Sequence, residues 1–346
     1  MRLLVLGGTG FLGRHIVERA VLGGWHVTTF NRGLTGADHP AAEALRGDRE
    51  TEGGLTALGS GRWDAVIDTS GHVPASVARS ARLLADRAAT YLYVSSLAAL
   101  PWPAHPASDE LAPRDCPLDA GLEDTGYGTL KAGCERAVRA AFGERALIVR
   151  PGIITGPRDD AGPVRGWLLR AARGGRFLAG GDPGDPVQLL DCRDVASWLL
   201  ACAREGRTGS LNAAGPLGRT TRGGLMDACV AVTGAGAEPV WADDRFLTAS
   251  GVRPWLDLPL WTPHDTPGYA HLWTVDASAA YAAGLSCRPL GETVEDTWAE
   301  LRDAPAGGAG SGAENGGESG AFSAERERAL IDDWLARHAT ASRTAP

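Results

Sequence analysis

The chain has 346 residues, of which 44% are hydrophobic, enough for one large domain or for a domain with a smaller lobe. Its formal net charge of -8 argues against nucleic acid or an anionic membrane surface as the main partner, and no apolar run reaches membrane-spanning length. The six cysteines are scattered without a C-x-x-C pair, which excludes a disulfide scaffold and a zinc site and favours a reducing, cytoplasmic setting.

The first predicted elements are a strand, a glycine-rich turn and a helix. Residues 2–6 predict a short buried strand, and residues 14–22 predict a helix with one apolar face. Between them lies Gly8-x-Gly10-x-x-Gly13, which in this position is typical of a dinucleotide-binding turn. The glycines let the backbone approach a pyrophosphate, and the helix N-terminus offers amide donors to its phosphates.

A second strand, predicted at residues 25–30, bears on the identity of the dinucleotide. An acidic residue at its end would bind the adenosine ribose hydroxyls and indicate NAD. Here Asn31 occupies that place and Arg32 follows, and a guanidinium can hold a 2′-phosphate through a forked contact. We therefore expect NADP as cofactor, with NAD as the alternative.

The later elements continue to alternate between strands and helices. Strands are predicted at residues 65–69, 91–95 and 147–150, and helices at 73–87 and 128–141. This alternation predicts an α/β fold, a Rossmann doubly wound parallel sheet with helices on both faces. After Arg150 the pattern loosens into helices at 164–173 and 193–204 and a Trp-rich stretch at 241–273, which predicts a smaller C-terminal substrate lobe.

The predicted domain organisation has four parts. They are a dinucleotide-binding core at 1–150, a mixed region at 151–303 that completes the sheet and forms the lobe, a linker at 304–322 and a helix at 323–338. The linker is rich in Gly, Ala and Ser. The helix carries Leu330, Ile331, Trp334 and Leu335 on one face. We expect this face to dock on its own chain or on a partner subunit, so a homodimer stays open.

Lys131 is the only lysine of the chain, which has 33 arginines. It follows Tyr127 by one helical turn, so the two side chains share a face. A free phenol has a pKa of about 10, and a nearby ammonium is expected to lower it toward the range useful for acid-base catalysis. Ser95 ends the strand predicted at 91–95 and Ser96 follows it, at the strand end where hydroxyls face the ligand crevice of such a sheet.

With these parts in place, the chain resembles the short-chain dehydrogenase/reductase superfamily over roughly residues 1–300. Within it, the chain resembles the extended and atypical branch, often labelled NAD-dependent epimerase/dehydratase. The resemblance is carried by Gly7-x-x-Gly10-x-x-Gly13, Ser95-Ser96, Tyr127-x-x-x-Lys131, Arg150-Pro151-Gly152 and Gly156-Pro157.

The resemblance implies a role for each matching residue. Ser96 would orient the substrate oxygen, Tyr127 would exchange its proton, and Lys131 would hold the nicotinamide ribose and tune Tyr127. Asp48 would contact the adenine, residues 69–71 would lie beside the adenosine ribose, and residues 151–153 would frame the nicotinamide. The candidate cofactor-binding residues are Gly7, Gly10, Phe11, Leu12, Gly13, Asn31, Arg32, Asp48, Thr69, Ser70, Gly71, Lys131, Pro151 and Ile153.

Two departures from the family's sugar-nucleotide enzymes bear on the substrate. Ile153 occupies the place where those enzymes usually carry an Asn that holds the substrate's phosphates, and Leu100-Pro101-Trp102 stands where they usually have Tyr-Gly. Both departures favour a less polar substrate, as does the Trp-rich lobe. Candidate substrate contacts, each with a plain loop, surface or core role as the alternative, are His72, Leu97, Trp102, Arg158, Gln188, Trp255 and Trp261.

These observations predict an NADPH-dependent reductase of a small or medium carbonyl or imine, with hydride from the nicotinamide and a proton from Tyr127. The alternative is an epimerase or dehydratase of a sugar nucleotide that keeps NAD bound. A second alternative is a redox-sensing or RNA-binding member of the fold without catalysis. The intact Tyr127 and Lys131 pair and the net charge of -8 argue against this last alternative.

Overall fold

The structure, a computed structural model, describes residues 1–303 and 322–341, and side chains as far as residue 338. The predicted linker lies outside these residues except for its last one. The chain divides into two compact units. The first, here called the sheet unit, consists of Met1–Ile154, Leu189–Gly215 and Thr274–Cys287; the second unit consists of Thr155–Gln188, Pro216–Trp273 and the described residues from Arg288 on.

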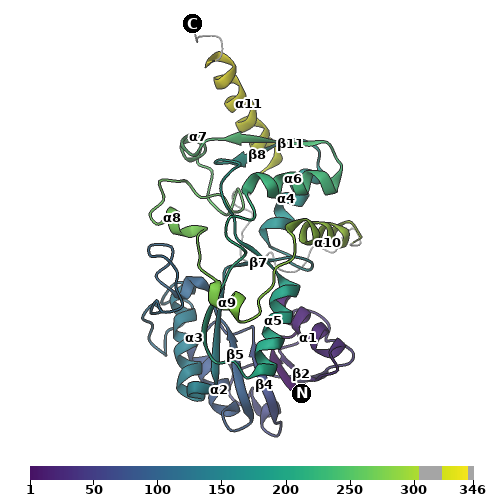
Figure 1. Ribbon diagram of the computed structural model, residues 1–346, viewed down its shortest axis with the longest axis vertical. Helices are drawn as coiled ribbons and strands as arrows, with labels where there is room; N and C mark the ends of the chain where they lie inside the picture. Colours follow the sequence, from purple (N-terminus) through teal and green to yellow (C-terminus); the bar gives the residue numbers. More distant parts are fainter. Residues whose placement is uncertain (304–321, 342–346) are drawn as a thin grey trace. The chain divides into compact units, whose positions relative to one another are not determined.

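Seven parallel strands form the sheet of the sheet unit, in the order β10-β6-β5-β4-β1-β2-β3 (Figure 1). They are β1 (Arg2–Leu6), β2 (His26–Asn31), β3 (Glu43–Arg46), β4 (Trp63–Asp68), β5 (Ala88–Val94), β6 (Ala146–Pro151) and β10 (Gly209–Ala213). The chain leaves β1 for β2 on one side and later returns to β4 on the other, so the strand order reverses beside β1. This topology confirms the predicted Rossmann fold.

Helices cover both faces of this sheet. Leu3 and Val5 of β1 belong to the core cluster under α1 and α5, whereas Leu4 and Leu6 belong to the cluster under α2 and α3. This two-residue alternation follows from the pleat of a strand. The helices and short turns of the unit are α1 (Phe11–Leu22), η1 (Thr56–Leu58), α2 (Pro74–Leu84), η2 (Leu97–Ala99), α3 (Tyr127–Phe142), η3 (Gly143–Arg145), α5 (Cys192–Glu205) and α9 (Ser278–Ala282).

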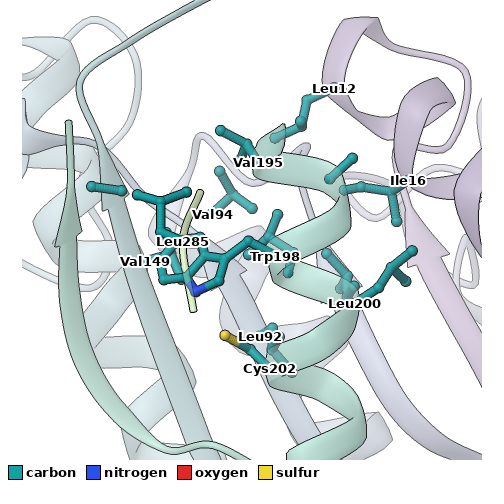
Figure 2. Packing of buried hydrophobic residues seen from close by; sticks show 14 of the residues in the cluster. Leu12, Ile16, Leu92, Val94, Val149, Val195, Trp198, Leu200, Cys202 and Leu285 are labelled. Carbon is teal, nitrogen blue, oxygen red and sulfur yellow. The ribbon is translucent and has the colours of Figure 1, made fainter. Parts of the chain in front are cut away.

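Helix α5 supplies much of the core on its face of the sheet. Figure 2 shows Trp198 of α5 beside Val149 of β6 and Leu285. Trp198 is buried, and its indole nitrogen donates a hydrogen bond to the carbonyl oxygen of Ala283 at 3.0 Å. The carboxylate of Asp191 caps the N-terminus of α5 by accepting from the Arg193 amide at 2.8 Å.

The second unit is mostly helical around a small parallel pair of strands. β8 (Gly175–Gly180) pairs with β11 (Ala237–Ala242). The helices are α4 (Pro163–Ala172), α6 (Arg222–Thr233), α7 (Asp244–Ala249), α8 (Tyr269–Leu272), α10 (Leu290–Asp303) and α11 (Ala324–Ala341). A further two-stranded ladder, which lies in the sheet unit except for Thr155, pairs β7 (Ile153–Thr155) with β9 (Leu189–Asp191). Among the described residues, no helix is both long and apolar enough to span a membrane.

The C-terminal helix α11 contacts β8 of its own chain. Glu327 accepts from the Leu178 amide at 3.2 Å and pairs with Arg173 at 2.8 Å and Arg170 at 3.3 Å. One turn further on, Ile331 is only 3% exposed. The helix thus takes one of the two docking positions that its apolar face predicts.

Candidate active site

The turn between β1 and α1 allows a ligand to approach the backbone closely. Gly7 has a φ of 91°, and a Cβ on Gly13 would lie 2.0 Å from the Gly7 carbonyl oxygen, so a larger residue does not fit there. No side chain caps the N-terminus of α1 at Gly10. The amides of Phe11 and Leu12 in the first helical turn are therefore suited to a phosphate group.

The loop that follows β4 is fixed by a buried ion pair. Arg49 donates two hydrogen bonds to the Asp68 carboxylate, at 2.8 and 2.9 Å, and a third to the Ser70 hydroxyl at 2.9 Å. The Tyr91 hydroxyl donates to the same carboxylate at 2.7 Å. Burial by itself would raise the pKa of Asp68, but the Arg49 guanidinium and these hydrogen bonds hold it below its ordinary value.

This ion pair connects two of the predicted cofactor loops. Asp48 precedes Arg49 in the loop after β3, is half-buried, and accepts from the Glu50 amide at 2.9 Å. The Thr69 hydroxyl donates to the Leu6 carbonyl at 3.1 Å. The predicted adenine contact, in the loop after β3, and the predicted ribose loop, after β4, are thus tied together although β1 and β2 separate the two strands in the sheet. Sequence reasoning assigned no role to Arg49 or Asp68.

The structure brings Ser96 near Tyr127. Tyr127 begins α3 and is 53% exposed, and nearby Ser96 acts to lower the pKa of its hydroxyl. Ser95 is committed elsewhere, because its hydroxyl donates to the buried Glu135 carboxylate at 2.6 Å. Of the two serines, Ser96 is therefore the one placed to act with the phenol.

Lys131 is buried behind this pair, with 3% of its surface exposed. Its ammonium donates to the carbonyl oxygens of Val94 at 2.9 Å and Gly71 at 3.0 Å, and to the Tyr93 hydroxyl at 3.2 Å. Burial lowers the pKa of Lys131 to about 8. The lysine thus links the end of β5 to the predicted ribose loop.

The expected lowering of the Tyr127 pKa is not found in this structure. Desolvation raises the pKa of Tyr127 above its ordinary value, and the hydrogen bond with Ser96 acts in the opposite direction. The Lys131 ammonium lies 5.9 Å from the centroid of the phenol ring and bonds to other groups. The phenol therefore holds its proton at neutral pH.

A second buried ion pair joins α3 to β6 beside the candidate site. Arg150 of β6 pairs with Glu135 of α3 at 2.7 Å, and the two side chains are only 2% and 1% exposed. The pair holds α3 against β6, where Pro151 is the buried last residue. Ile153, which follows at the start of β7, is partly exposed.

Three of the predicted substrate contacts lie in the sheet unit. The exposed His72 has its ring centroid 6.3 Å from that of Tyr127. Desolvation and then Lys131 lower the pKa of His72, so its imidazole is neutral at pH 7. Trp102 is half-buried and Leu97 is 2% exposed within the core. Of the three, His72 is the one that the structure places beside the phenol.

The other four predicted substrate contacts lie in the second unit. Trp255 is 42% exposed, has a φ of 65° and stacks on Trp273 with ring centroids 5.7 Å apart. Arg158 also has a left-handed backbone, with a φ of 66°, and Gln188 is buried. Trp261 requires a correction, because it has no exposed surface and its indole nitrogen donates to Asp244 at 2.8 Å. It is a core residue.

An acidic residue that sequence reasoning missed lies against the end of β2. Asp38, from the loop after the strand, accepts from Asn31 at 3.1 Å and from the Thr29 hydroxyl at 3.2 Å. Arg46, at the end of β3, donates to both Asp38 oxygens. Arg32, the expected phosphate contact, is exposed. The only signal in the sequence was an Asp seven residues beyond the expected place.

Comparison with known proteins places these features in a wider context. The model of the NAD dependent epimerase/dehydratase family matches residues 3–214. A search of curated protein sequences finds no match.

Three solved structures show the same fold. A putative epimerase from Burkholderia cenocepacia is 19% identical, with a TM-score of 0.66, covering 88% of this chain and 98% of its own. The UDP-glucose 4-epimerase of Thermus thermophilus, solved with NAD, is 19% identical, with a TM-score of 0.64, covering 88% and 100%. The dTDP-glucose 4,6-dehydratase of Bacillus anthracis, also solved with NAD, is 15% identical, with a TM-score of 0.62, covering 87% and 96%.

Proposed function

Because the chain belongs to the NAD-dependent epimerase/dehydratase family, we propose that it keeps NAD bound and acts as an epimerase or dehydratase of a nucleotide sugar. This reverses the order of the two functions that the sequence predicts. The observation that carries the change is the acceptor-rich end of β2, where Asp38 lies beside Asn31. Such a site suits a ribose diol better than the 2′-phosphate of NADP.

The residues present fit a dinucleotide. The glycine turn from Gly7 to Gly13 and the free N-terminus of α1 would hold the pyrophosphate. Asp48 and the loop at residues 69–71 would hold the adenosine, and the backbone at 151–153 would frame the nicotinamide. When bound, NAD supplies reversible hydride acceptance from a carbon that bears a hydroxyl.

The chain's own residues would move the substrate's proton. Ser96 would orient a substrate hydroxyl, since it lies near enough to the Tyr127 hydroxyl to lower its pKa. Because Tyr127 is exposed, a substrate can approach its phenol, which would exchange a proton with the substrate oxygen. Lys131, whose ammonium is held at the end of β5 by the Val94 carbonyl oxygen, would contact the nicotinamide ribose, as the family resemblance implies.

Two considerations bear on the substrate. The relatives with this fold include a UDP-glucose epimerase and a dTDP-glucose dehydratase, and they cover both units of the chain, which supports a nucleotide sugar. A reductase of a less polar carbonyl or imine is the second candidate. It is favoured by Ile153, which is apolar and partly exposed where sugar-nucleotide enzymes carry an Asn.

The test begins with the protein as purified. Released nucleotide, identified by mass and absorbance, is expected to be NAD at close to one equivalent per chain. The same protein, without added cofactor, is then incubated with UDP-glucose and with dTDP-glucose. Formation of an epimer or a dehydrated sugar, lost in Tyr127→Phe, supports the proposal. An empty protein that consumes NADPH with a carbonyl substrate contradicts it and supports the reductase.

A further inference from the structure

We propose that the hydroxyl of Tyr93, a residue of β5, is an exchangeable partner of Lys131: it holds the ammonium while the cofactor is absent and releases it to a hydroxyl of the nicotinamide ribose. The inference rests on the proposed function only in that a nicotinamide dinucleotide binds here. It does not depend on the choice between NAD and NADP, because both carry the same nicotinamide ribose, nor on the substrate or the reaction.

The ammonium of Lys131 has its donors engaged by the protein. An ammonium group has three N–H donors and no acceptor. Lys131 donates to the carbonyl oxygens of Val94 and Gly71, at 2.9 and 3.0 Å. Its third bond goes to the Tyr93 hydroxyl at 3.2 Å. A ribose hydroxyl can contact this ammonium only by accepting an N–H, so one of the three protein acceptors has to give way.

The Tyr93 hydroxyl is the acceptor that loses least when the ammonium turns away. Its contact with Lys131 is the longest of the three. The hydroxyl also donates to the Gly71 carbonyl oxygen at 2.8 Å, so it stays bonded after the exchange. This second bond matters because Tyr93 is fully buried, and a buried hydroxyl without any partner is unfavourable.

The Tyr93 ring keeps the ammonium nearby during the exchange. Lys131 Nζ lies 4.8 Å from the centroid of the Tyr93 ring and 5.9 Å from that of the Tyr127 ring. Aromatic rings attract a cation at such distances, up to about 6 Å. The ammonium can therefore turn from the Tyr93 hydroxyl toward a ligand beside Tyr127 while it keeps its bonds to the two carbonyl oxygens.

The exchange predicts the sign of a substitution. In Tyr93→Phe the ring remains, but one N–H of the buried Lys131 ammonium loses its acceptor in the free protein. A ribose hydroxyl then supplies an acceptor without displacing one, so binding should be tighter than in wild type. A hydroxyl that only shaped the site would have the opposite effect, since its removal would weaken binding.

The experiment measures dinucleotide binding without substrate. Stripped protein is titrated with NADH and with NADPH at about pH 6.5, where Lys131, with a pKa of about 8, is an ammonium. The fluorescence of the reduced nicotinamide gives the Kd. Whichever dinucleotide wild type binds, Tyr93→Phe is expected to bind it at least about threefold more tightly. The free variant is expected to melt at a lower temperature than free wild type.

Two controls isolate the contact between Tyr93 and Lys131. Tyr91→Phe removes another fully buried phenol hydroxyl of β5, which donates to Asp68, and is expected to lower the melting temperature without tightening binding. Lys131→Met removes the ammonium. In that background, adding Tyr93→Phe is expected to leave the Kd unchanged, because the interacting partner is gone.

Equal or weaker binding by folded Tyr93→Phe overturns the inference, as does equal tightening in Tyr91→Phe. A measurement on wild type covers the case in which Tyr93→Phe does not fold. Because Lys131 is the only lysine, isotope labelling of lysine at Nζ gives a single side-chain resonance. We expect saturating dinucleotide to shift it, and a resonance that does not move overturns the inference.

These failures differ from a failure of the proposed function. Wild type that binds neither dinucleotide overturns both the proposed cofactor and the inference, whereas an unchanged Kd in Tyr93→Phe overturns the inference alone. The absence of an epimerase or dehydratase reaction changes none of these binding measurements.

Discussion

At Lys131, the ammonium group is surrounded by three protein acceptors at 2.9 to 3.2 Å. The sequence suggested a site that needs a compact cation, since every other basic position outside the histidines is arginine. The structure supplies the physical reason. Carbonyl oxygens of Gly71 and Val94 and the Tyr93 hydroxyl converge on one point, which suits a tetrahedral ammonium and not a planar guanidinium.

We therefore expect Lys131→Arg to lower turnover by roughly 10- to 100-fold although the charge is kept, because charged hydrogen bonds of about 1.5–3 kcal/mol are disturbed. Steady-state kinetics on folded protein measures the effect, with the melting temperature as control. Turnover within about threefold of wild type would show that the ammonium's geometry is not needed.

His264 of the second unit lies between two carboxylates, an arrangement that sequence reasoning did not identify. Its Nε2 lies 2.9 Å from Asp185, and its Nδ1 bonds to Asp244. Burial by itself would lower the pKa of His264, but Asp244 and Asp185 raise it above its ordinary value. Arg222, 3.4 Å from Asp185, and the Tyr269 ring complete the surroundings.

A histidine whose pKa is raised by folding stabilises the protein fully below the unfolded-state pKa, and this contribution is lost as the pH rises through the folded-state pKa. We expect wild type to exceed His264→Gln in unfolding free energy at about pH 5.5, with a smaller difference at about pH 8.5. Denaturant titrations at both values measure it. A difference that grows with pH would contradict the assigned charge pairing.

At the scale of elements, one charged residue of α11 holds this helix against α4 and β8. Glu327 is 4% exposed and bonds to Arg170, Arg173 and the Leu178 amide. Glu325, in the first turn of the same helix, is exposed and provides a matched control.

Glu327→Gln is expected to reduce the unfolding free energy by about 1–3 kcal/mol, since two guanidinium groups lose their shared carboxylate. Glu325→Gln should change it by less than about 0.5 kcal/mol. Both values come from denaturant unfolding curves. Equal effects of the two substitutions would mean that α11 is not held by this contact.

At the scale of the whole molecule, the chain passes repeatedly between two compact units. The sheet unit contains the glycine turn, the catalytic candidates and the Asp38 loop, so a dinucleotide would bind a structure made from three separate segments of the chain. A ligand that binds only the native form stabilises it by mass action.

Adding NAD to stripped protein at about 100 times its Kd should therefore stabilise the sheet unit by about 2.7 kcal/mol. NADP at the same concentration should do less, because Asp38 disfavours it. Calorimetric melting curves measure both shifts. An equal shift with the two nucleotides, or none with NAD, would contradict the assignment of the site.

The sequence was sufficient for the elements whose cause is local. The buried strand at 2–6 is observed at Arg2–Leu6, and the helix predicted at 128–141 is observed at Tyr127–Phe142. The strand is a continuous apolar run followed by a glycine, and the helix has one buried face and a glycine at each end. By contrast, β3 has the sequence Glu-Ala-Leu-Arg, without β-branched residues, and exists because β2 offers it a partner.

By itself, therefore, the sequence determined the α/β fold, the glycine turn and the position of Tyr127 one helical turn before Lys131, since spacing along a helix or at a strand end decides them. Only the tertiary structure decided the burial of Trp261 and the neighbours of Lys131 and Asn31. These depend on loops whose paths no local pattern encodes. Asp38 reaches Asn31 because distant Arg14 and Arg46 hold its loop, and such contacts form only when the strands have come together.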